Sequence, residues 1–222
     1  MKVTLITHTP EPEKVIASAA KLCYSSSDIE SLMNGLTTEK IEAFIKKLTD
    51  LGHESPLEHC TFTFGIEGVS RALLAQLTRH RIASYSVKSQ RYVKEDNFDY
   101  VIPPTIANDI ASEFLFKDLM RRIQETYDSF ILNGIPAEDA RYVLPNACST
   151  QLITTFNVRG LLNFFELRCC NRAQTEIRQL ADMMLNICKE VAPNLFANAG
   201  ASCVRGKCKE GKMSCGNPKG GR

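Results

Sequence analysis

The chain contains no tryptophan, no long apolar run and almost no excess of either charge. Lysine and arginine number 27 against 25 aspartates and glutamates, so the general electrostatic footprint of a nucleic-acid-binding protein is absent. No apolar stretch is long enough to span a membrane, and the N-terminus lacks the features of a signal peptide. Neither GxGxxG nor GxxxxGK[ST] occurs, so no Rossmann or P-loop site is indicated. We expect a cytoplasmic protein that binds neither membrane nor nucleic acid.

Cysteine is abundant, because nine cysteines in 222 residues is a high and odd number. In a cytoplasmic protein they are mostly reduced. Six stand among apolar residues and are expected to be small buried side chains: Cys23, Cys60, Cys148, Cys169, Cys170 and Cys188. The other three, Cys203, Cys208 and Cys215, lie in a segment rich in Gly, Lys and Ser that cannot build a core. We predict one folded domain over residues 1–200 and a flexible, reduced tail over 201–222.

The apolar periodicity predicts an α+β fold in which helices dominate. Alternating patterns indicate strands at residues 2–7, 60–66 and 149–156. Helical patterns occupy residues 12–22, 38–48, 69–79, 108–133, 136–145, 157–168 and 175–191. The two kinds of segment do not alternate as regular βαβ units.

The segment Arg79–Arg91, predicted to be a loop, concentrates positive charge and hydroxyl groups. It holds three arginines, one histidine and the hydroxyls of Ser84, Ser86 and Ser89, with no acidic residue. Guanidinium groups beside hydroxyl donors suit a phosphate or another oxyanion. The structural alternative is a helix end whose cations complement the helix dipole. Three arginines together favour the anion site.

Two other polar groups have a purely structural interpretation that sequence alone favours. The segment His53–His59 is not an HExxH motif, because its histidines are six residues apart and Pro56 interrupts a helix. It predicts a capped turn, or contacts to a polar ligand, and no metal. Glu138 and Arg141 are three residues apart, which indicates an intrahelical ion pair.

Arg168 gives a clearer functional indication than these two polar groups. It shares an apolar helix face with Phe164 and Phe165, so its guanidinium needs an anionic or hydrogen-bonding partner. That partner is expected near Glu166, on another chain or on a ligand. No Ser-His-Asp order and no cysteine beside a base indicate a protein nucleophile, so chemistry carried by a bound cofactor is favoured.

Arg79-His80-Arg81, followed after seven residues by Ser89, resembles the RHR-x7-S motif of flavin-dependent thymidylate synthases. Further matching motifs follow in the expected order over residues 1–200: His53-Glu-Ser-Pro-x-Glu58-His59, Gln76, Glu138-x-x-Arg141-x-x-Leu-Pro145, Asn157-x-Arg159-x-Leu-x-Asn163 through Arg168, and Ala173-Gln174-x-Glu176. The resemblance implies reductive methylation of dUMP to dTMP without a covalent protein nucleophile. It implies 5,10-methylenetetrahydrofolate as carbon donor, FAD reduced by NADPH as hydride source, and a homotetramer whose subunits share active sites.

The resemblance also assigns residues. The dUMP-binding set it implies is Gln76, Arg79, Val87, Lys88, Ser89, Gln90, Arg91, Arg141 and Arg168. Arg168 is expected to be catalytic, polarising the uracil ring and favouring loss of its NH proton. The FAD-binding set it implies is His53, Ser55, Glu58, Arg79, His80, Arg81, Asn157, Arg159 and Asn163. Val87 stands where relatives often have glutamate, so it offers only backbone contacts.

Three alternatives remain open from the sequence. One is a small nucleic-acid-binding module using the arginine segment and the basic tail, which the low net charge disfavours. Another is a flavoprotein oxidoreductase that lacks methyl transfer. Finally, the three tail thiols suit zinc or a redox pair, although their spacing is not that of a zinc ribbon and a fourth ligand is missing.

Overall fold

The computed structural model describes residues 1–219, which form two compact units. Unit 1 comprises Met1–Lys2, Gly65–Arg79 and Tyr85–Ile153; unit 2 comprises Val3–Phe64, His80–Ser84 and the chain from Thr154 on. The fold is α+β and dominated by helices, as predicted.

Four strands form one sheet in the order β1-β2-β4-β3, and the sheet is antiparallel. Their bounds are Lys2–His8 for β1, Thr61–Ser70 for β2, Ala83–Val87 for β3 and Ser149–Asn157 for β4. The direction of β2 against β4 follows from the bonds at their ends. Val158 N donates to Cys60 O at 3.0 Å, and Arg71 N donates to Cys148 O at 3.0 Å.

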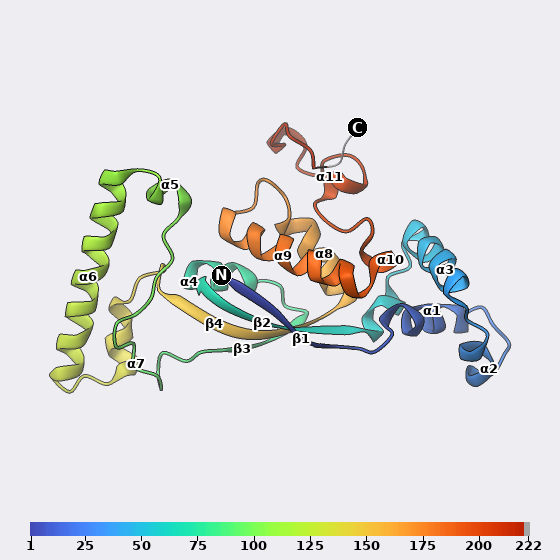
Figure 1. Ribbon diagram of the computed structural model, residues 1–222, viewed down its shortest axis with the longest axis horizontal. Coiled ribbons are helices and arrows are strands. Elements are labelled where there is room, and N and C mark those ends of the chain that lie inside the picture. Colours follow the sequence, from blue (N-terminus) through green and yellow to red (C-terminus); the bar gives the residue numbers. More distant parts are fainter. Residues whose placement is uncertain (220–222) are drawn as a thin grey trace. The chain divides into compact units, whose positions relative to one another are not determined.

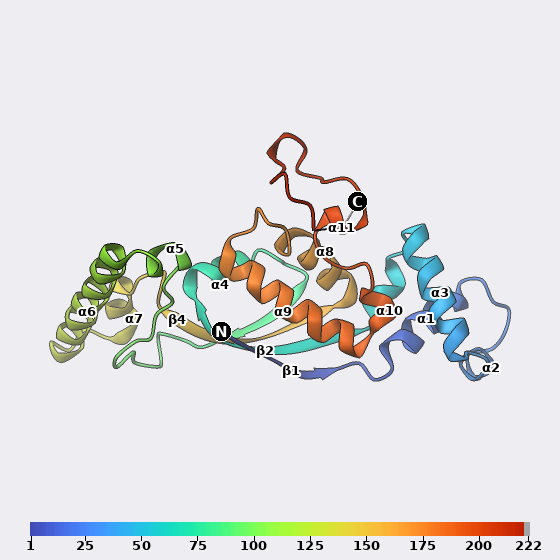
Figure 2. The same ribbon diagram turned by 45° about the horizontal axis from the view of Figure 1, so that its top comes forward.

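The helical segments of unit 2 lie in the N-terminal and C-terminal parts of the chain. They are α1 (Pro12–Leu22), α2 (Ile29–Asn34), α3 (Thr38–Leu51), η1 (Ser55–His59), α8 (Val158–Arg168), α9 (Thr175–Val191), α10 (Pro193–Phe196), α11 (Ser202–Arg205) and η3 (Gly211–Met213). Figures 1 and 2 both show α9 alongside α8 and α10. Phe62 on β2 meets Phe196 on α10 edge to face at 5.7 Å, and Phe196 also meets Phe165 on α8. These fully buried rings hold α8 in place, and so they fix the position of Arg168 at the end of that helix.

The helices of unit 1 are α4 (Arg71–Leu77), α5 (Pro104–Ala107), α6 (Ile110–Leu132), α7 (Ala137–Ala140) and η2 (Arg141–Val143). Phe98, Met120 and Cys148 form a small core between α6 and the start of β4. The long helix α6 buries only Met120 and Tyr127 of its 23 residues. Several of its large apolar side chains are exposed, among them Ile110, Phe114 and Leu132.

Several predicted boundaries were wrong, each for a local reason. Residues 83–87 of the predicted arginine loop form strand β3. The helix expected from Val69 begins at Arg71, because β2 continues to Ser70 and the Ser70 hydroxyl then caps the helix by accepting from Leu73 N. Helix α2 was not predicted at all; Asp28 caps it by accepting from Ser31 N.

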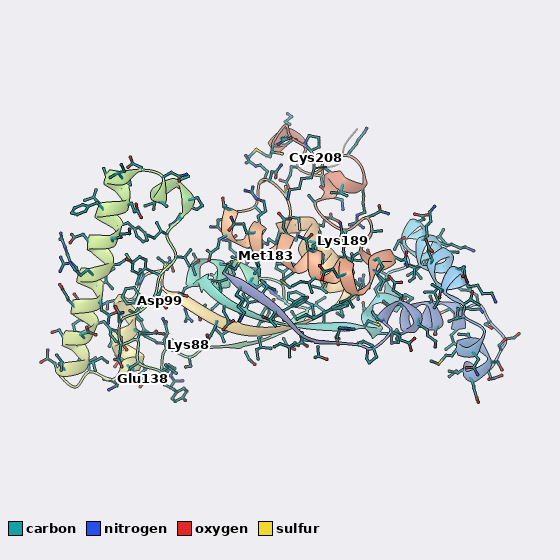
Figure 3. All side chains as sticks on the ribbon, in the orientation of Figure 1. Lys88, Asp99, Glu138, Met183, Lys189 and Cys208 are labelled. Carbon is teal, nitrogen blue, oxygen red and sulfur yellow. The ribbon has the colours of Figure 1, made fainter. Side chains whose placement is uncertain are left out.

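The tail folds back on the helices of unit 2. Arg205 and Lys209 both pair with Glu166 of α8, at 3.0 and 2.5 Å. Lys219 pairs with Asp182 of α9 at 3.1 Å. Figure 3 labels Cys208 in this segment. These ion pairs connect the described tail residues to α8 and α9.

Candidate active site

The start of helix α8 is built by Asn157 and Gly160. Asn157 has an extended backbone, and its side-chain oxygen accepts from Gly160 N at 2.7 Å, which caps the helix. A Cβ at position 160 would lie 3.1 Å from Ile82 O. Glycine therefore allows the segment His80–Ser84 to approach α8, and the capping interpretation of Asn157 is confirmed.

Arg159, in the first turn of α8, holds two carboxylates of the turn around η1. Its Nε donates to Glu54 at 3.0 Å and its Nη1 donates to Glu58 at 2.5 Å. The bond to Glu58 is the main cause that raises the pKa of Arg159. All three side chains are about half exposed, so the pairs contribute little to stability. The group is an exposed polar surface available for a ligand.

His53 and Ser55 lie in the same turn. The His53 Nδ1 is 3.2 Å from the hydroxyl of Tyr24, and the two rings stack with centroids 6.3 Å apart. The two residues are 29 positions apart in the sequence, and this contact was not predicted. Ser55 opens η1 and is exposed, as is Asn163 one turn after Arg159 on α8.

Arg168 and His80 form a pair in unit 2. Arg168 Nε donates to His80 Nε2 at 3.0 Å, so that imidazole nitrogen is an acceptor and His80 is neutral. The ring meets Phe164 edge to face at 5.0 Å and is 8% exposed. Burial, and then the charge of Arg168, lower the pKa of His80 to about 4. The predicted need of Arg168 for a hydrogen-bonding partner is confirmed, but the sequence did not point to His80.

A second arginine group lies in unit 1. Arg91 Nη2 and Nε both donate to Glu138 Oε2, at 3.0 and 3.2 Å. Arg141 Nε donates to the carbonyl oxygen of Glu138 at 3.0 Å. The predicted intrahelical Glu138–Arg141 ion pair is therefore wrong, because α7 is only four residues long and the Glu138 carboxylate turns to Arg91. Arg91 and Arg141, both in the dUMP-binding set that the resemblance implies, thus each contact Glu138.

The side chains of the segment Val87–Arg91 have different surroundings. Lys88 Nζ donates to Glu95 at 3.0 Å, and Gln90 is buried with its amide donating to Cys148 Sγ at 3.4 Å. The Ser89 hydroxyl accepts from Arg91 N at 3.2 Å. Val87 is half-buried. Of these five residues, Gln90 is buried, Arg91 is exposed and the other three are half-buried.

Gln76 and Arg79 close helix α4, where Arg79 N donates to Gln76 O at 3.3 Å. Arg79 and Arg81 are exposed, and Gln76 is half-buried. Within residues 1–219, neither of these two arginines has a carboxylate partner. Both guanidinium groups are thus suited to an external anion.

Four of the nine cysteines are buried thiols with raised pKa values. Burial raises the pKa of Cys60 and Cys148 to about 11, and it raises the pKa of Cys169 and Cys188 further. A thiol with a raised pKa is unreactive. Burial is confirmed for these four, whereas Cys23 is exposed and Cys170 is half-buried. Among the described residues no cluster of three or more His, Cys, Asp or Glu side chains is arranged for a metal.

The protein is thus a helix-rich α+β protein that carries several groups of arginine side chains. Residues 4–194 match the family described as thymidylate synthase complementing protein, and the chain belongs to that family. Three similar proteins are named flavin-dependent thymidylate synthase. That of Clostridium tetani is 53% identical over 97% of this chain and 93% of its own length; that of Geobacter sulfurreducens is 50% identical over 97% and 94%. That of Nitratidesulfovibrio vulgaris is 46% identical over 97% and 94%.

The resemblance predicted from the RHR motif is thereby confirmed at the level of the family. No helix in the described part of the chain is both long and apolar enough to cross a membrane.

Proposed function

We propose that this protein is a flavin-dependent thymidylate synthase that converts dUMP to dTMP. The carbon donor is 5,10-methylenetetrahydrofolate, which leaves as tetrahydrofolate, and NADPH reduces the flavin. The observation that carries the proposal is the pairing of Arg168 with a neutral His80 in a chain that belongs to this family. FAD, when bound, supplies the hydride.

Arg168 is proposed to be the catalytic residue. His80 accepts from its Nε, which fixes the plane of the guanidinium while Phe164 holds the imidazole. A guanidinium held in this way is preorganised to stabilise negative charge on a uracil ring that loses its NH proton. Because His80 is uncharged at neutral pH, it does not compete with Arg168 for that charge.

The dUMP phosphate is proposed to bind Arg91 and Arg141, with Gln76 and Arg79 completing the nucleotide set. Both guanidinium groups of the first pair already meet at Glu138, and a phosphate is a stronger bidentate acceptor for such forks than an exposed carboxylate. Lys88 and Gln90 contribute backbone contacts only, because their side chains bond within unit 1.

The proposed FAD-binding residues fit an anionic, aromatic cofactor. Arg79 and Arg81 suit the pyrophosphate, and the stacked ring of His53 offers a flat surface. His80 and Asn157 contribute little beyond positioning, since one holds Arg168 and the other caps α8. The remaining contacts are proposed to come from Ser55, Glu58, Arg159 and Asn163, which are all exposed.

No protein nucleophile is needed in this proposal. The Ser89 hydroxyl accepts from Arg91 N, and the buried thiols have raised pKa values. A serine in that position is better placed to contact the nucleotide than to attack it.

We also propose a homotetramer with shared active sites, in a cytoplasmic setting. Four large apolar side chains of α6 support self-association, being 52 to 87% exposed in the single chain: Ile110, Phe114, Leu115 and Leu119. We propose that residues 1–200 form the catalytic domain and 201–222 a tail outside it, since the family match ends at residue 194. Light scattering on the purified protein tests the oligomeric state.

The decisive experiment is an anaerobic assay for dTMP with FAD, NADPH, dUMP and methylenetetrahydrofolate. We expect dTMP from the wild type, and from Arg168→Ala we expect retained flavin absorbance but no dTMP. Arg172→Ala, an exposed arginine four residues further on, is the matched control and is expected to keep activity.

Other outcomes separate the alternatives. Flavin reduction by NADPH without any response to dUMP would favour an oxidoreductase that lacks methyl transfer. A protein that takes up no FAD would refute both flavin functions, and dTMP formation by Arg168→Ala would refute the role of that arginine.

A further inference from the structure

The turn that follows Arg168 is held from two sides, by helix α9 and by the described tail, residues 201–219. Arg168 is the last residue of α8, and the last turn of a helix keeps fewer of its internal hydrogen bonds than the centre. From α9, Arg178 Nη1 donates to Asn171 O at 3.0 Å. From the tail, Asn217 O accepts from Asn171 Nδ2 at 2.9 Å. Asn171 therefore ties the end of α8 to both neighbours.

The tail also contacts α8 on the other side of Arg168. Glu166 stands two residues before Arg168, and its two carboxylate oxygens accept from different tail residues. One accepts from Arg205 Nη2 at 3.0 Å and the other from Lys209 Nζ at 2.5 Å. With both cations in place, the Glu166 side chain is only 21% exposed. The contacts of the tail thus lie on both sides of Arg168 along the chain, at positions 166 and 171.

The tail is itself a closed segment with a buried start. Ala201, where it begins, is 1% exposed. Lys209 N donates to Ser202 Oγ at 3.3 Å, and Lys219 N donates to Cys203 Sγ at 3.3 Å. The last described residue of the tail therefore returns to its beginning. Figures 1 and 2 both show this segment next to α8.

These contacts are suited to fixing a position more than to stabilising the fold. The cations on Glu166 are 44 and 69% exposed, and exposed ion pairs contribute at most about 1 kcal/mol each. A catalytic group, in contrast, is sensitive to small displacements, since a shift of about 1 Å can lower a rate by roughly a hundredfold. A weak restraint on the last turn of α8 therefore affects the reaction more than it affects folding.

We propose that residues 201–219 form a strap that positions Arg168, with Glu166 and Asn171 as the positioning residues through which the strap acts. With the strap bound, Arg168 Nε donates to His80 Nε2 at 3.0 Å. Without it, the last turn of α8 frays and this hydrogen bond weakens. The inference rests on the proposed thymidylate synthase function only for the catalytic role of Arg168, because the pairing with His80 is measured independently of activity.

The double variant Arg205→Gln/Lys209→Gln tests the proposal in the full-length protein, because it removes both ion pairs of Glu166 and leaves α8 unchanged. Lys207→Gln/Lys212→Gln is the matched control. It removes the same charge from the same segment, and neither of these exposed lysines forms an ion pair within residues 1–219. The charge-preserving variant Arg205→Lys/Lys209→Arg should behave like the wild type.

Three measurements follow the strap, the Arg168–His80 pair and the reaction separately. Limited digestion with subtilisin, which does not require lysine or arginine, should cleave the tail faster in the double variant. Burial and then the charge of Arg168 lower the pKa of His80, so NMR titration should show a higher pKa in the double variant, in the direction of Arg168→Gln. The kcat for dTMP formation should fall about tenfold or more, with flavin absorbance retained.

Faster cleavage of the tail with an unchanged His80 pKa would overturn the proposal, because a released tail would then leave Arg168 in place. An unchanged cleavage rate, equal effects in the lysine control, or a shifted His80 pKa with normal kcat would overturn it as well. If circular dichroism shows that the double variant does not fold, Asn171→Ala, which removes the bond to Asn217, decides by the same measurements. A wild type that forms no dTMP would refute the proposed function, whereas the His80 titration would still decide whether the strap positions Arg168.

Discussion

Acidification should destabilise this protein through His80. The imidazole is buried against Phe164 and accepts a hydrogen bond from Arg168, so a proton on Nε2 would remove the acceptor and place two positive charges together. Burial, with a smaller contribution from Arg168, lowers the pKa of His80 from 6.5 to about 4. The substitution His80→Gln keeps an acceptor at this position but does not titrate.

The size of the effect follows from the two pKa values. As pH falls below 6.5, the unfolded chain takes up a proton at this histidine and the folded chain does not, so unfolding is favoured. The loss is complete only below about pH 4, where both states are protonated. At about 1.4 kcal/mol per pH unit, the free energy of unfolding decreases by roughly 3 kcal/mol across this window. Above pH 6.5 this histidine contributes no pH dependence.

Urea unfolding from pH 8 to pH 4, at one protein concentration, measures the effect as the difference between wild type and His80→Gln. NMR titration of the His80 ring provides the pKa directly. In Arg168→Gln the pKa should rise but stay below 6.5, since burial is the larger cause. A difference curve that is flat down to pH 4, or a His80 pKa near 6.5 in the wild type, would refute the argument.

Three further predictions concern positions outside this pair. Gly160→Ala should destabilise the protein by about 1–3 kcal/mol in thermal unfolding, because the added Cβ would crowd Ile82 O. A small increase in stability, which alanine usually gives in a helix, would contradict this prediction. Glu166→Gln weakens the ion pairs that hold the tail and should speed tryptic cleavage there, and an unchanged rate would show that these pairs do not retain the tail. Arg91→Gln should change the free energy of unfolding by less than about 1 kcal/mol, because the Arg91–Glu138 pair is half exposed. The same substitution should raise KM for dUMP. A normal KM together with a large loss of stability would contradict the proposed role of Arg91.

The fold was predictable where apolar residues repeat with the period of the backbone. Strand β2 buries Phe62, Phe64 and Ile66 at alternate positions, which is the pattern that predicted it. Strand β3 was missed because it lies at the edge of the sheet and has serines at its exposed positions, Ser84 and Ser86, with only half-buried residues between them. An edge strand needs little apolar alternation, so its sequence resembles a loop.

The pairing within the candidate site was less predictable, because its partners are remote along the chain. Arg168 and His80 are 88 residues apart, and Arg159 and Glu54 are 105 residues apart. Side-chain spacing predicts contacts only within about one helical turn. Applied to Glu138, it predicted an ion pair with Arg141, whereas the carboxylate pairs with Arg91. The residue types needed at the site could be identified from motifs, but the contacts among them depend on the fold.

Residues 87–91 show how one motif serves two purposes. The side chains of Lys88 and Gln90 turn into unit 1, where they pair with Glu95 and bond to Cys148, while Ser89 lies between them and bonds to a backbone NH. Strand β3 ends at Val87, and the chain turns after Ser89, where Arg91 N and Val93 N donate to Ser89 oxygens. The lysine then neutralises one oxygen of Glu95 and leaves the other without a donor. Lys88 therefore links this segment to Glu95, whose backbone NH donates to the Tyr127 hydroxyl on α6.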